Sequence, residues 1–324
     1  MPMSPLNSQA SLSGSEGPAP TAVTAVMLRG WPLPQPDQEG DKDGRGSVLV
    51  VGGATQVPGA IILAGIAALR AGAGKLSMAT CRSIAQAVAV AVPEALVAGL
   101  PEGLSGDIDP SAAQEIAGRA NKVGAALIGP GMLDQDGATA LLRALLPAIE
   151  ATPLVLDAGA LAGVSADPTL LHRLEGKVVL TPHAGEMASM LGISKEEVKR
   201  DPLATARHAA AQWRAVVALK GANTYIAAPD GATYCHTEGT VGLATSGSGD
   251  TLAGVIVGLL ARGASPAQAT AWGVYLHGQA GARLARRMGT LGFLAREVLA
   301  EIPPLMAHLV VRQALFDTLP EDSA

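Results

Sequence analysis

Aromatic residues are scarce in this sequence: Phe, Trp and Tyr together make up 2% of the 324 residues. A core must therefore consist mainly of Ala, Val, Leu and Ile, and the 39 glycines allow close helix-on-sheet packing. Hydrophobic residues reach 48%, enough for one large α/β domain or two small ones. Cysteine is nearly absent, and Cys81 and Cys235 lack metal-type spacing. We expect two small buried side chains in a reducing compartment, and therefore a cytoplasmic protein.

Charge and long apolar runs are also limited. Charged residues make up 16% of the chain, the net charge is −5, and no basic block stands out, which argues against a nucleic-acid partner. The apolar run over residues 252–260 is too short to span a membrane, which takes about 18 residues or more. No positive charge precedes Arg29, so the start lacks the pattern of a secretory signal. We expect neither a nucleic-acid partner nor a membrane partner.

Apolar runs alternate with helical patterns along most of the chain, which predicts an α/β fold. Such runs, buried on both faces, are typical of a mainly parallel central sheet with helices on both sides, a three-layer α/β/α sandwich. Pro229-Asp230-Gly231 predicts one late β-hairpin. The predicted strands are 47–52, 75–79, 125–128, 154–156, 177–180, 215–219, 223–228 and 232–236. The predicted helices are 60–69, 83–92, 111–119, 136–149, 167–174, 184–191, 201–213, 249–262, 266–287 and 294–315.

Composition divides the chain into three parts. Residues 1–40 are rich in Ser, Pro, Gly and Asp and are predicted to be a flexible lead-in. Within it we interpret residues 29–34 as a cover segment that rests on the domain. Residues 41–316 are predicted to form the α/β domain, and residues 317–324 a C-terminal tail.

Polar and glycine-rich residues follow six predicted elements at the same edge of the sheet. In an open α/β sheet, ligands bind beyond the carboxyl ends of the strands. The agreement among several strand ends therefore predicts a pocket wall at this edge. The residues concerned are Gly52-Gly53, Gly129-Pro130-Gly131, Asp157, His183, Lys220-Gly221 and the loop Ser246-Gly247-Ser248-Gly249.

The glycine-rich loop 246–249 opens the apolar helix predicted over residues 249–262. Its small residues leave backbone N–H groups free to bind a phosphate or a developing oxyanion at the helix start. Asp250 comes next, and two interpretations are open. It caps the helix, or it accepts a proton from a hydroxyl that attacks phosphorus.

Three other positions also have two interpretations each. His183 either helps to start a helix or binds an anionic or amide-bearing substrate. Lys220 to Thr224 form either a plain turn or a site for nucleotide phosphates. Asp157 either pairs with local amides or contacts the substrate.

Several familiar signatures are excluded. Ala73-Gly74-Lys75-Leu76 resembles a P-loop but lacks its first glycine and its Ser or Thr, and no G-x-G-x-x-G follows the first strand. No G-x-S-x-G elbow is present. The six histidines are scattered without ligand spacing, which argues against a zinc site.

Seven elements in this order resemble the ADP/ATP-dependent NAD(P)H-hydrate dehydratases, the carbohydrate-kinase-like branch of the ribokinase-like fold. The resemblance covers about residues 42–306, and its most specific parts are the histidine motif and the Gly-Ser-Gly-Asp loop. The elements are Gly52-Gly53 with Pro58-Gly59-Ala60, Gly129-Pro130-Gly131, Leu156-Asp157-Ala158, Thr181-Pro182-His183-Ala184-Gly185-Glu186, Leu219-Lys220-Gly221, Pro229-Asp230-Gly231 and Gly247-Ser248-Gly249-Asp250.

The resemblance implies a metabolite-repair lyase. A phosphoryl group passes from ADP or ATP to the hydroxyl of the (S)-epimer of NADH or NADPH hydrate, phosphate leaves, and the ring double bond returns. Mg²⁺ is implied on the phosphates, with no side chain assigned as a metal ligand. The resemblance implies that Asp250 is the general base and that the amides of Gly247, Ser248 and Gly249 bind the transferring phosphate, with Gly249 also near the nucleotide. The residues implied to contact the adenine nucleotide are Lys220, Gly221, Ala222, Asn223 and Thr224. The residues implied to contact the hydrate are Ala60, Gly131, His183 and Asp250.

Three departures from the family pattern stand out. Many members have Asn-Pro-Gly where this chain has Thr240-Val241-Gly242, and Asp-Ala-Asp where it has Asp157-Ala158-Gly159. The usual acidic residue is not evident at Ala295-Arg296. An epimerase domain often precedes this one, and residues 1–46 are too few for it, so we expect any epimerase to be a separate chain.

Two other functions stay open beside the dehydratase. A kinase of a small hydroxylated metabolite uses the same fold, and a nucleotide-binding module without catalysis is the third alternative. The family tends to assemble, so we expect a homo-oligomer.

Overall fold

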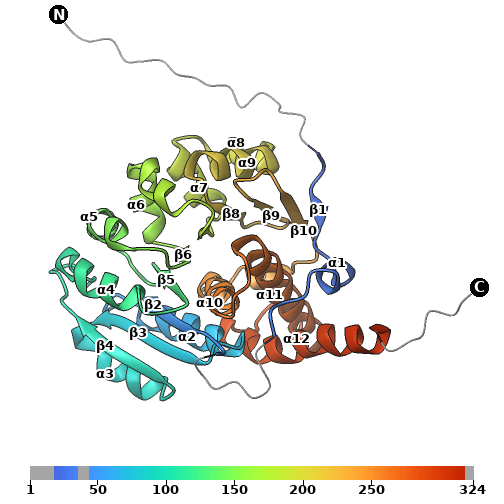
Figure 1. Ribbon diagram of the computed structural model, residues 1–324, viewed down its shortest axis with the longest axis horizontal. Coiled ribbons are helices and arrows are strands. Elements are labelled where there is room, and N and C mark those ends of the chain that lie inside the picture. Colours follow the sequence, from blue (N-terminus) through green and yellow to red (C-terminus); the bar gives the residue numbers. More distant parts are fainter. Residues whose placement is uncertain (1–17, 36–43, 318–324) are drawn as a thin grey trace, which may run out of the picture.

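A computed structural model of the protein describes residues 18–35 and 44–317. Ten strands in this part of the chain form one sheet, and helices lie on both of its faces (Figure 1). The strands are β1 (Thr21–Ala22), β2 (Ser47–Val51), β3 (Lys75–Cys81), β4 (Ala95–Leu100), β5 (Ala125–Ile128), β6 (Leu154–Leu156), β7 (Val178–Leu180), β8 (Val216–Leu219), β9 (Thr224–Ala227) and β10 (Thr233–His236). The α-helices are α1 (Ala25–Arg29), α2 (Pro58–Arg70), α3 (Arg82–Ala91), α4 (Ala113–Ala120), α5 (Gln135–Leu145), α6 (Ala160–Ala166), α7 (Ala184–Leu191), α8 (Lys195–Arg200), α9 (Pro202–Trp213), α10 (Ser248–Ala261), α11 (Pro266–Met288) and α12 (Ala295–Asp317). Short 3₁₀ helices are η1 (Pro110–Ala112), η2 (Leu146–Ala148), η3 (Pro168–Leu174) and η4 (Val241–Leu243).

The sheet follows the order β1-β10-β9-β8-β7-β6-β5-β2-β3-β4. β9 is antiparallel to both of its neighbours, and every other neighbouring pair is parallel. The predicted late hairpin is β9–β10, whose turn has Gly231 at a φ of 92°. The prediction of a mainly parallel sheet between two helical layers is confirmed.

Alternate residues of the central strands enter two separate cores. On β2, Val48 and Val50 pack on one face of the sheet, whereas Leu49 and Val51 pack on the other. The first core also takes residues from α2, α10, α11 and α12, and the second from α4, α5, α6, α7 and α9. Period-two alternation between two covered faces explains why these strands are apolar throughout.

The apolar helix α10 packs very closely on α2. A Cβ at Gly254 would lie 2.2 Å from Ala64 O, and one at Gly258 would lie 2.5 Å from Ala68 O, so only glycine fits at both positions. The buried Leu, Ile and Val side chains of α10 each contribute roughly 1.5–3 kcal/mol by leaving water. This packing fixes the start of α10 at the carboxyl edge of the sheet.

Residues 18–35 belong to the fold, although they lie within the lead-in expected over residues 1–40. β1 adds to the edge of β10, and the ring of Trp31 stacks on Tyr234 with centroids 5.6 Å apart. Trp31 O accepts a hydrogen bond from Trp272 Nε1 at 2.9 Å. The segment expected over residues 29–34 therefore does cover α11. Most of the expected lead-in, residues 1–17 and 36–40, lies outside the described residues, as do residues 318–324 of the expected tail.

The structure contains secondary-structure elements that were not predicted from the sequence, and one predicted α-helix is instead a 3₁₀ helix. α8 has a capping box, in which Glu197 N–H donates to Ser194 Oγ at 3.1 Å, so its signal is present in the sequence. α6 also forms, and the helix predicted over residues 167–174 is the 3₁₀ helix η3. β4 also was not predicted, although it is an apolar run; it lies at the edge of the sheet and is only partly buried.

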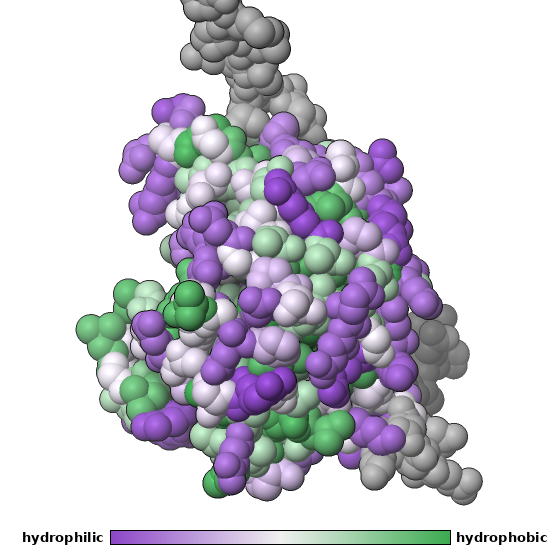
Figure 2. Space-filling view, turned by 90° about the vertical axis from the view of Figure 1, so that its left-hand side faces the viewer, coloured by the Kyte–Doolittle hydropathy of each residue, from purple (hydrophilic) through white to green (hydrophobic). Residues whose placement is uncertain are grey.

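The edge at β4 exposes apolar side chains. Val90 on α3 is 78% exposed and Leu96 on β4 is 67% exposed. Figure 2 shows this side of the molecule, where hydrophobic residues lie among hydrophilic ones. Within the described ranges, every helix is too short or too polar to cross a bilayer.

Candidate active site

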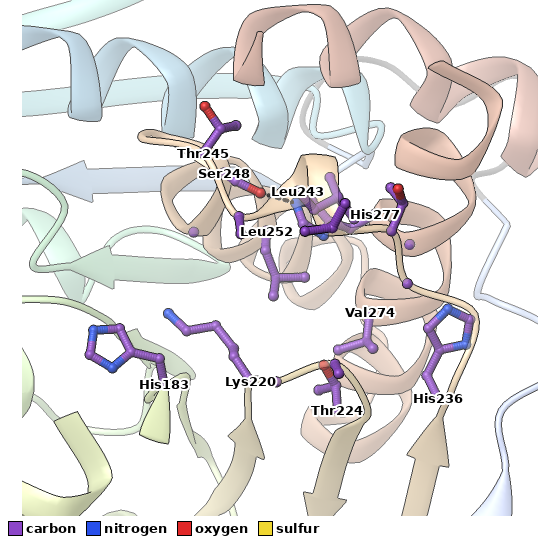
Figure 3. Close-up of a pocket in the computed structure, with 18 residues that line it drawn as sticks. His183, Lys220, Thr224, His236, Leu243, Thr245, Ser248, Leu252, Val274 and His277 are labelled. Atoms are coloured by element: carbon purple, nitrogen blue, oxygen red, sulfur yellow. Dashed lines mark hydrogen bonds between the residues drawn. The ribbon is translucent and has the colours of Figure 1, made fainter. Parts of the chain in front are cut away.

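A cavity of about 620 Å³ lies at the carboxyl ends of β7 and β8, beside the start of α10 and along α11 (Figure 3). Small-molecule sites usually have volumes of about 300–1,000 Å³. Lys220 extends from the end of β8 into the cavity, and Val274 and His277 face it from α11 (Figure 3). The lining residues are His183, Lys220, Gly221, Ala222, Thr224, His236, Gly239, Thr240, Val241, Leu243, Ala244, Thr245, Ser248, Gly249, Leu252, Val274, His277 and Gly278.

Lys220 is held by two carboxylates at one end of the cavity. Its Nζ lies 3.1 Å from Asp157 Oδ1 and 3.9 Å from Glu186 Oε2. Asp157 is buried and also accepts a hydrogen bond from Thr181 Oγ1 at 2.7 Å. Burial by itself lowers the pKa of Lys220, but the carboxylates outweigh this effect and the pKa is raised. The lysine therefore stays charged and keeps a fixed position, as an anion site requires.

The glycine-rich loop places the first turn of α10 against this lysine. Gly247 is the N-cap with a φ of 86°, and a Cβ there would lie 2.5 Å from Leu63 Cδ1. A Cβ at Gly249 would lie 3.4 Å from Lys220 Nζ. Backbone N–H groups in the first turn of a helix have no partner within the helix, and the dipole favours an anion there. The loop is thus a cradle whose geometry suits a phosphate beside a positive charge.

Asp250 is the third residue of α10, and the helix start has no side-chain capping bond. The N-cap is Gly247, so Asp250 is an acidic residue of the first turn rather than the N-cap, and its role as general base stays a prediction. Burial, together with the nearby Asp157, raises the pKa of Asp250 to about 6, against an opposing effect of Lys220. A carboxylate whose pKa lies close to neutral pH is suited to accept a proton in catalysis.

Ser248 turns its hydroxyl away from the cradle. Its Oγ lies 2.9 Å from Nε2 of His277, a buried residue of α11 (Figure 3). Burial lowers the pKa of His277 to about 4, so this imidazole is neutral at neutral pH. The pair fixes the loop to α11. The Ser248 N–H donates to Thr245 O at 3.2 Å, so among the described loop residues the N–H groups of Gly247 and Gly249 remain for an anion.

His183 starts α7, so its helix-capping interpretation is confirmed. Its Nδ1 accepts hydrogen bonds from the N–H groups of Gly185 and Glu186, both at 3.0 Å. Glu186 Oε2 in turn accepts from His183 N–H at 2.7 Å, completing a capping box. Because Nδ1 is the acceptor, the neutral ring carries its proton on Nε2. His183 also lines the cavity, and its Nε2 lies 3.5 Å from Glu186 Oε1.

A second group of the predicted residues lies apart from the cavity lining. A Cβ at Gly131 would lie 2.9 Å from Ala60 Cβ, so these two positions are in contact. Gly131 has a φ of 70° in the turn after β5, and Ala60 lies in the first turn of α2. Leu63, one turn further along α2, meets the loop at Gly247. The start of α10 thus lies between the cavity and this second group.

The structure gathers most of the predicted site residues around the start of α10. Lys220, Gly221, Ala222, Thr224, His183, Ser248 and Gly249 line the cavity, whereas Asn223, Ala60, Gly131, Gly247 and Asp250 do not. Sequence reasoning missed His277 and His236, both of which line the cavity. The histidines were judged only by metal-ligand spacing, and position within a predicted helix gave no sign that His277 faces a pocket.

The Mg²⁺ that the resemblance implies would need carboxylate ligands near the cradle. Among the described residues, no group of three or more His, Cys, Asp or Glu is arranged to hold a metal ion. Mg²⁺ at phosphate sites usually has one or two carboxylate ligands, with phosphate oxygens and water completing the shell. Asp157 and Asp250 lie close enough to influence each other electrostatically beside the cradle. These residues fit an ion that is held largely by the phosphates of a nucleotide.

A sequence model of the NAD(P)H-hydrate dehydratase family matches residues 48–304. The chain belongs to this family. It is 48% identical over 293 residues to the ADP-dependent (S)-NAD(P)H-hydrate dehydratase of Xanthomonas campestris, covering 90% of this chain and 98% of that protein. Membership confirms the resemblance drawn from the motifs.

Solved structures agree with this family assignment and with a ribokinase-like fold. The ADP/ATP-dependent NAD(P)H-hydrate dehydratase from Bacillus subtilis, co-crystallised with ATP and Mg²⁺, matches with a TM-score of 0.75 and 30% identity, over 89% of this chain and 98% of that one. A ribokinase-like superfamily protein from Enterococcus faecalis matches with a TM-score of 0.77 and 27% identity, over 89% and 96%.

Some family members are longer. The bifunctional NAD(P)H-hydrate repair enzyme of Moorella thermoacetica is 40% identical over 89% of this chain, which covers 54% of that protein. The chain thus spans about half the length of this relative.

Proposed function

We propose that this protein dehydrates the (S)-epimer of NADH hydrate or NADPH hydrate to NAD(P)H, with ADP, or alternatively ATP, as the phosphoryl donor. The observation that carries the proposal is the start of α10, where Asp250 follows a glycine cradle that faces Lys220 at the edge of the cavity. Family membership and the names of the relatives support the same activity.

The proposed reaction converts a poor leaving group into a good one. The hydroxyl of the hydrated ring attacks the terminal phosphorus of ADP, its proton passes to Asp250, and AMP leaves. The lone pair of the ring nitrogen then expels phosphate, and loss of a ring proton restores the double bond. Bound Mg²⁺ supplies positive charge on the phosphates. The products from ADP are NAD(P)H, AMP and phosphate.

The chain's own residues receive the following roles in this proposal. The amides of Gly247, Ser248 and Gly249 hold the transferring phosphoryl group, assisted by the charge of Lys220. Lys220, Gly221, Ala222, Asn223 and Thr224 contact the nucleotide, and Ala60, Gly131 and His183 line the hydrate site.

One assay tests the proposed function against its competitors. The protein is incubated with NADH hydrate, Mg²⁺ and ADP or ATP, and the absorbance of restored NADH is followed. Nucleotide-dependent restoration supports the dehydratase. Nucleotide consumption only with a small alcohol substrate would support a kinase, and tight nucleotide binding without turnover would support a binding module. Parallel titrations with both nucleotides and both hydrates establish the preferred pair.

The expected partners and location remain predictions. Self-association is proposed on the exposed apolar residues Val90 and Leu96 at the β4 edge, and sedimentation that shows only monomer would contradict it. An NAD(P)H-hydrate epimerase is proposed as a partner, in line with the bifunctional repair enzymes among the relatives. Fluorescent tagging of the full chain tests the expected cytoplasmic location.

A further inference from the structure

Asp107 is a buried carboxylate that lies outside the cavity and has no role in the proposed reaction. It is 5% exposed, in the segment between β4 and α4. Its Oδ2 accepts hydrogen bonds from the N–H groups of Leu133, at 3.0 Å, and Asp134, at 2.7 Å. Its Oδ1 is buried and has no hydrogen-bond partner among the described residues. An unpartnered buried oxygen costs free energy, so such a group calls for an explanation.

The segment around Asp107 closes on itself. Glu102 and Ile108 form an antiparallel bridge, and Gly103 N–H donates to the backbone oxygen of Asp107 at 2.9 Å. Ile108 is buried below this small loop. The backbone of Asp107 is therefore held in place by its own segment. Its carboxylate thus has a fixed position from which it binds the backbone of residues 133–134.

Two turns at the carboxyl edge of the sheet rest on this segment. In the turn after β2, Thr55 N–H donates to Gly106 O at 2.8 Å. The same turn is joined to the turn after β5, because Ala54 N–H donates to Gly131 O at 2.8 Å. Asp107 adds the connection to residues 133–134 of the second turn. The segment thus makes hydrogen bonds to both turns and holds their backbones in place.

The second turn has no room to shift toward α2. A Cβ at Gly131 would lie 2.9 Å from Ala60 Cβ and 2.9 Å from Val57 O. The shape of this region is therefore set by where the backbone of residues 129–134 lies. Asp107 acts on that backbone through two charge-assisted hydrogen bonds, which are stronger than neutral ones.

We propose that Asp107 is a positioning residue for the hydrate-binding side of the site, holding the turn of residues 129–134 against Ala60. This rests on the proposed function. Asp107 acts through the backbone N–H groups of Leu133 and Asp134 and does not touch the substrate. Two backbone donors converge on its Oδ2, which accounts for a carboxylate side chain at this position.

A purely structural role makes a different prediction. Asp134 is the N-cap of α5, where its Oδ1 accepts from Gly137 N–H at 3.0 Å, so Asp107 also supports the start of that helix. If support of α5 were its whole role, removing Asp107 would lower thermal stability without a selective effect on the hydrate. Separate KM values for hydrate and nucleotide distinguish the two roles.

The test compares Asp107→Ala and Asp107→Asn with the matched variant Asp109→Ala. Asp109 lies in the same segment, but its Oδ1 accepts from Ser111 N–H at 2.9 Å, at the start of η1. We expect Asp107→Ala to raise the KM for NADH hydrate about tenfold, because small displacements of a positioning element weaken productive binding. Asp107→Asn keeps an acceptor but loses the charge, so a rise of about threefold is expected. The KM for ADP should stay within about twofold of wild type in all variants, and Asp109→Ala should leave both KM values unchanged.

An unchanged hydrate KM in folded Asp107→Ala, or an equal rise of both KM values, would overturn the proposal. If Asp107→Ala does not fold, Asp107→Asn is judged by the same two values. Circular dichroism and the thermal midpoint verify that each variant is folded before kinetics are measured. Absence of hydrate turnover by the wild-type protein would instead refute the proposed function, so the two failures are distinguishable.

Discussion

Two regions flank the start of α10, and they are held together by different groups. On the cavity side the contacts are made by polar and charged side chains. Lys220 meets Asp157 at 3.1 Å, and Ser248 meets His277 at 2.9 Å. A substitution there removes one interaction and leaves the backbone in place.

On the other side, around Ala60, the structure depends on backbone contacts and small residues. Gly53 N–H donates to Pro130 O at 2.8 Å, and a Cβ at Gly131 would collide with Ala60. Any larger side chain there changes the shape of the region itself. In the proposed function this difference becomes a division of work, in which charge and hydrogen bonding on the cavity side hold the nucleotide and the fixed backbone around Ala60, together with His183, shapes the hydrate site.

Asp250→Asn is expected to have the largest effect, because Asp250 lies between the two regions. We expect kcat to fall about 100-fold through loss of general-base help, with small changes in both KM values. Steady-state kinetics with NADH hydrate and ADP measure this loss. Activity within a few-fold of wild type would remove Asp250 from the role of base.

The pH profile gives the control for this variant. Burial raises the pKa of Asp250 to about 6, so wild-type kcat/KM should rise as the pH increases through about 6, and the variant should lack this rise.

The pKa of Asp250 in the folded protein exceeds the ordinary value of 3.8, so the stability that the protonated carboxyl contributes is present below pH 3.8 and is lost as the pH rises through about 6. Above that pH, Asp250→Asn should unfold at the wild-type temperature or higher.

Lys220→Met tests the cavity side. It leaves the buried carboxylate of Asp157 without its ion pair, which typically destabilises a protein by about 3–5 kcal/mol. Loss of a charged hydrogen-bond donor should weaken ADP binding by about tenfold or more, measured by calorimetry. Lys177→Met is the control, because Lys177 is exposed just before the opposite end of the adjacent strand β7. Equal ADP affinity in both variants would contradict a role for Lys220 in nucleotide binding.

Gly131→Ala tests the other side. The new Cβ would lie 2.9 Å from Ala60 Cβ on a backbone with a φ of 70°, so the turn must shift. We expect the KM for hydrate to rise about tenfold while ADP affinity stays at the wild-type value. Gly192→Ala is a matched control, since Gly192 has a φ of 66° but nothing within 4 Å of the added Cβ. A similar kinetic effect in both would show that backbone strain alone is responsible.

The sheet and the edge that carries the site could be predicted because their signals are local. The central strands β2, β5, β6, β7 and β8 are short apolar runs, and glycine or a polar residue follows each of them, as at Asp157 and Lys220. The loop at Gly247 was recognisable because small residues directly precede a very apolar helix. The family resemblance then assigned roles that spacing alone left open, such as the choice between cap and base for Asp250.

The rest depends on contacts between distant segments. β1 exists because it adds to β10, and Trp31 is placed by Trp272, which is 241 residues away. His277 lies inside a correctly predicted helix, but only the packing of α11 against α10 turns it toward Ser248. The role of Asp107 likewise depends on residues 133–134, which approach it only in the folded chain.

Ser248→Ala is expected to have the smallest effect, because the cradle uses backbone N–H groups that the variant keeps. Its main consequence is a buried His277 Nε2 without a partner, which costs about 1–3 kcal/mol of stability. Burial lowers the pKa of His277 from 6.5 to about 4, so the stability that the neutral imidazole contributes is present above pH 6.5 and is lost as the pH falls toward 4. We expect the same loss of stability in acid for Ser248→Ala. We expect kcat/KM to fall only about threefold, measured beside Thr251→Val, which removes another buried hydroxyl from α10. A loss as large as that of Asp250→Asn would mean that the Ser248 hydroxyl itself contacts the reacting phosphate, and that side chains rather than the backbone form the cradle.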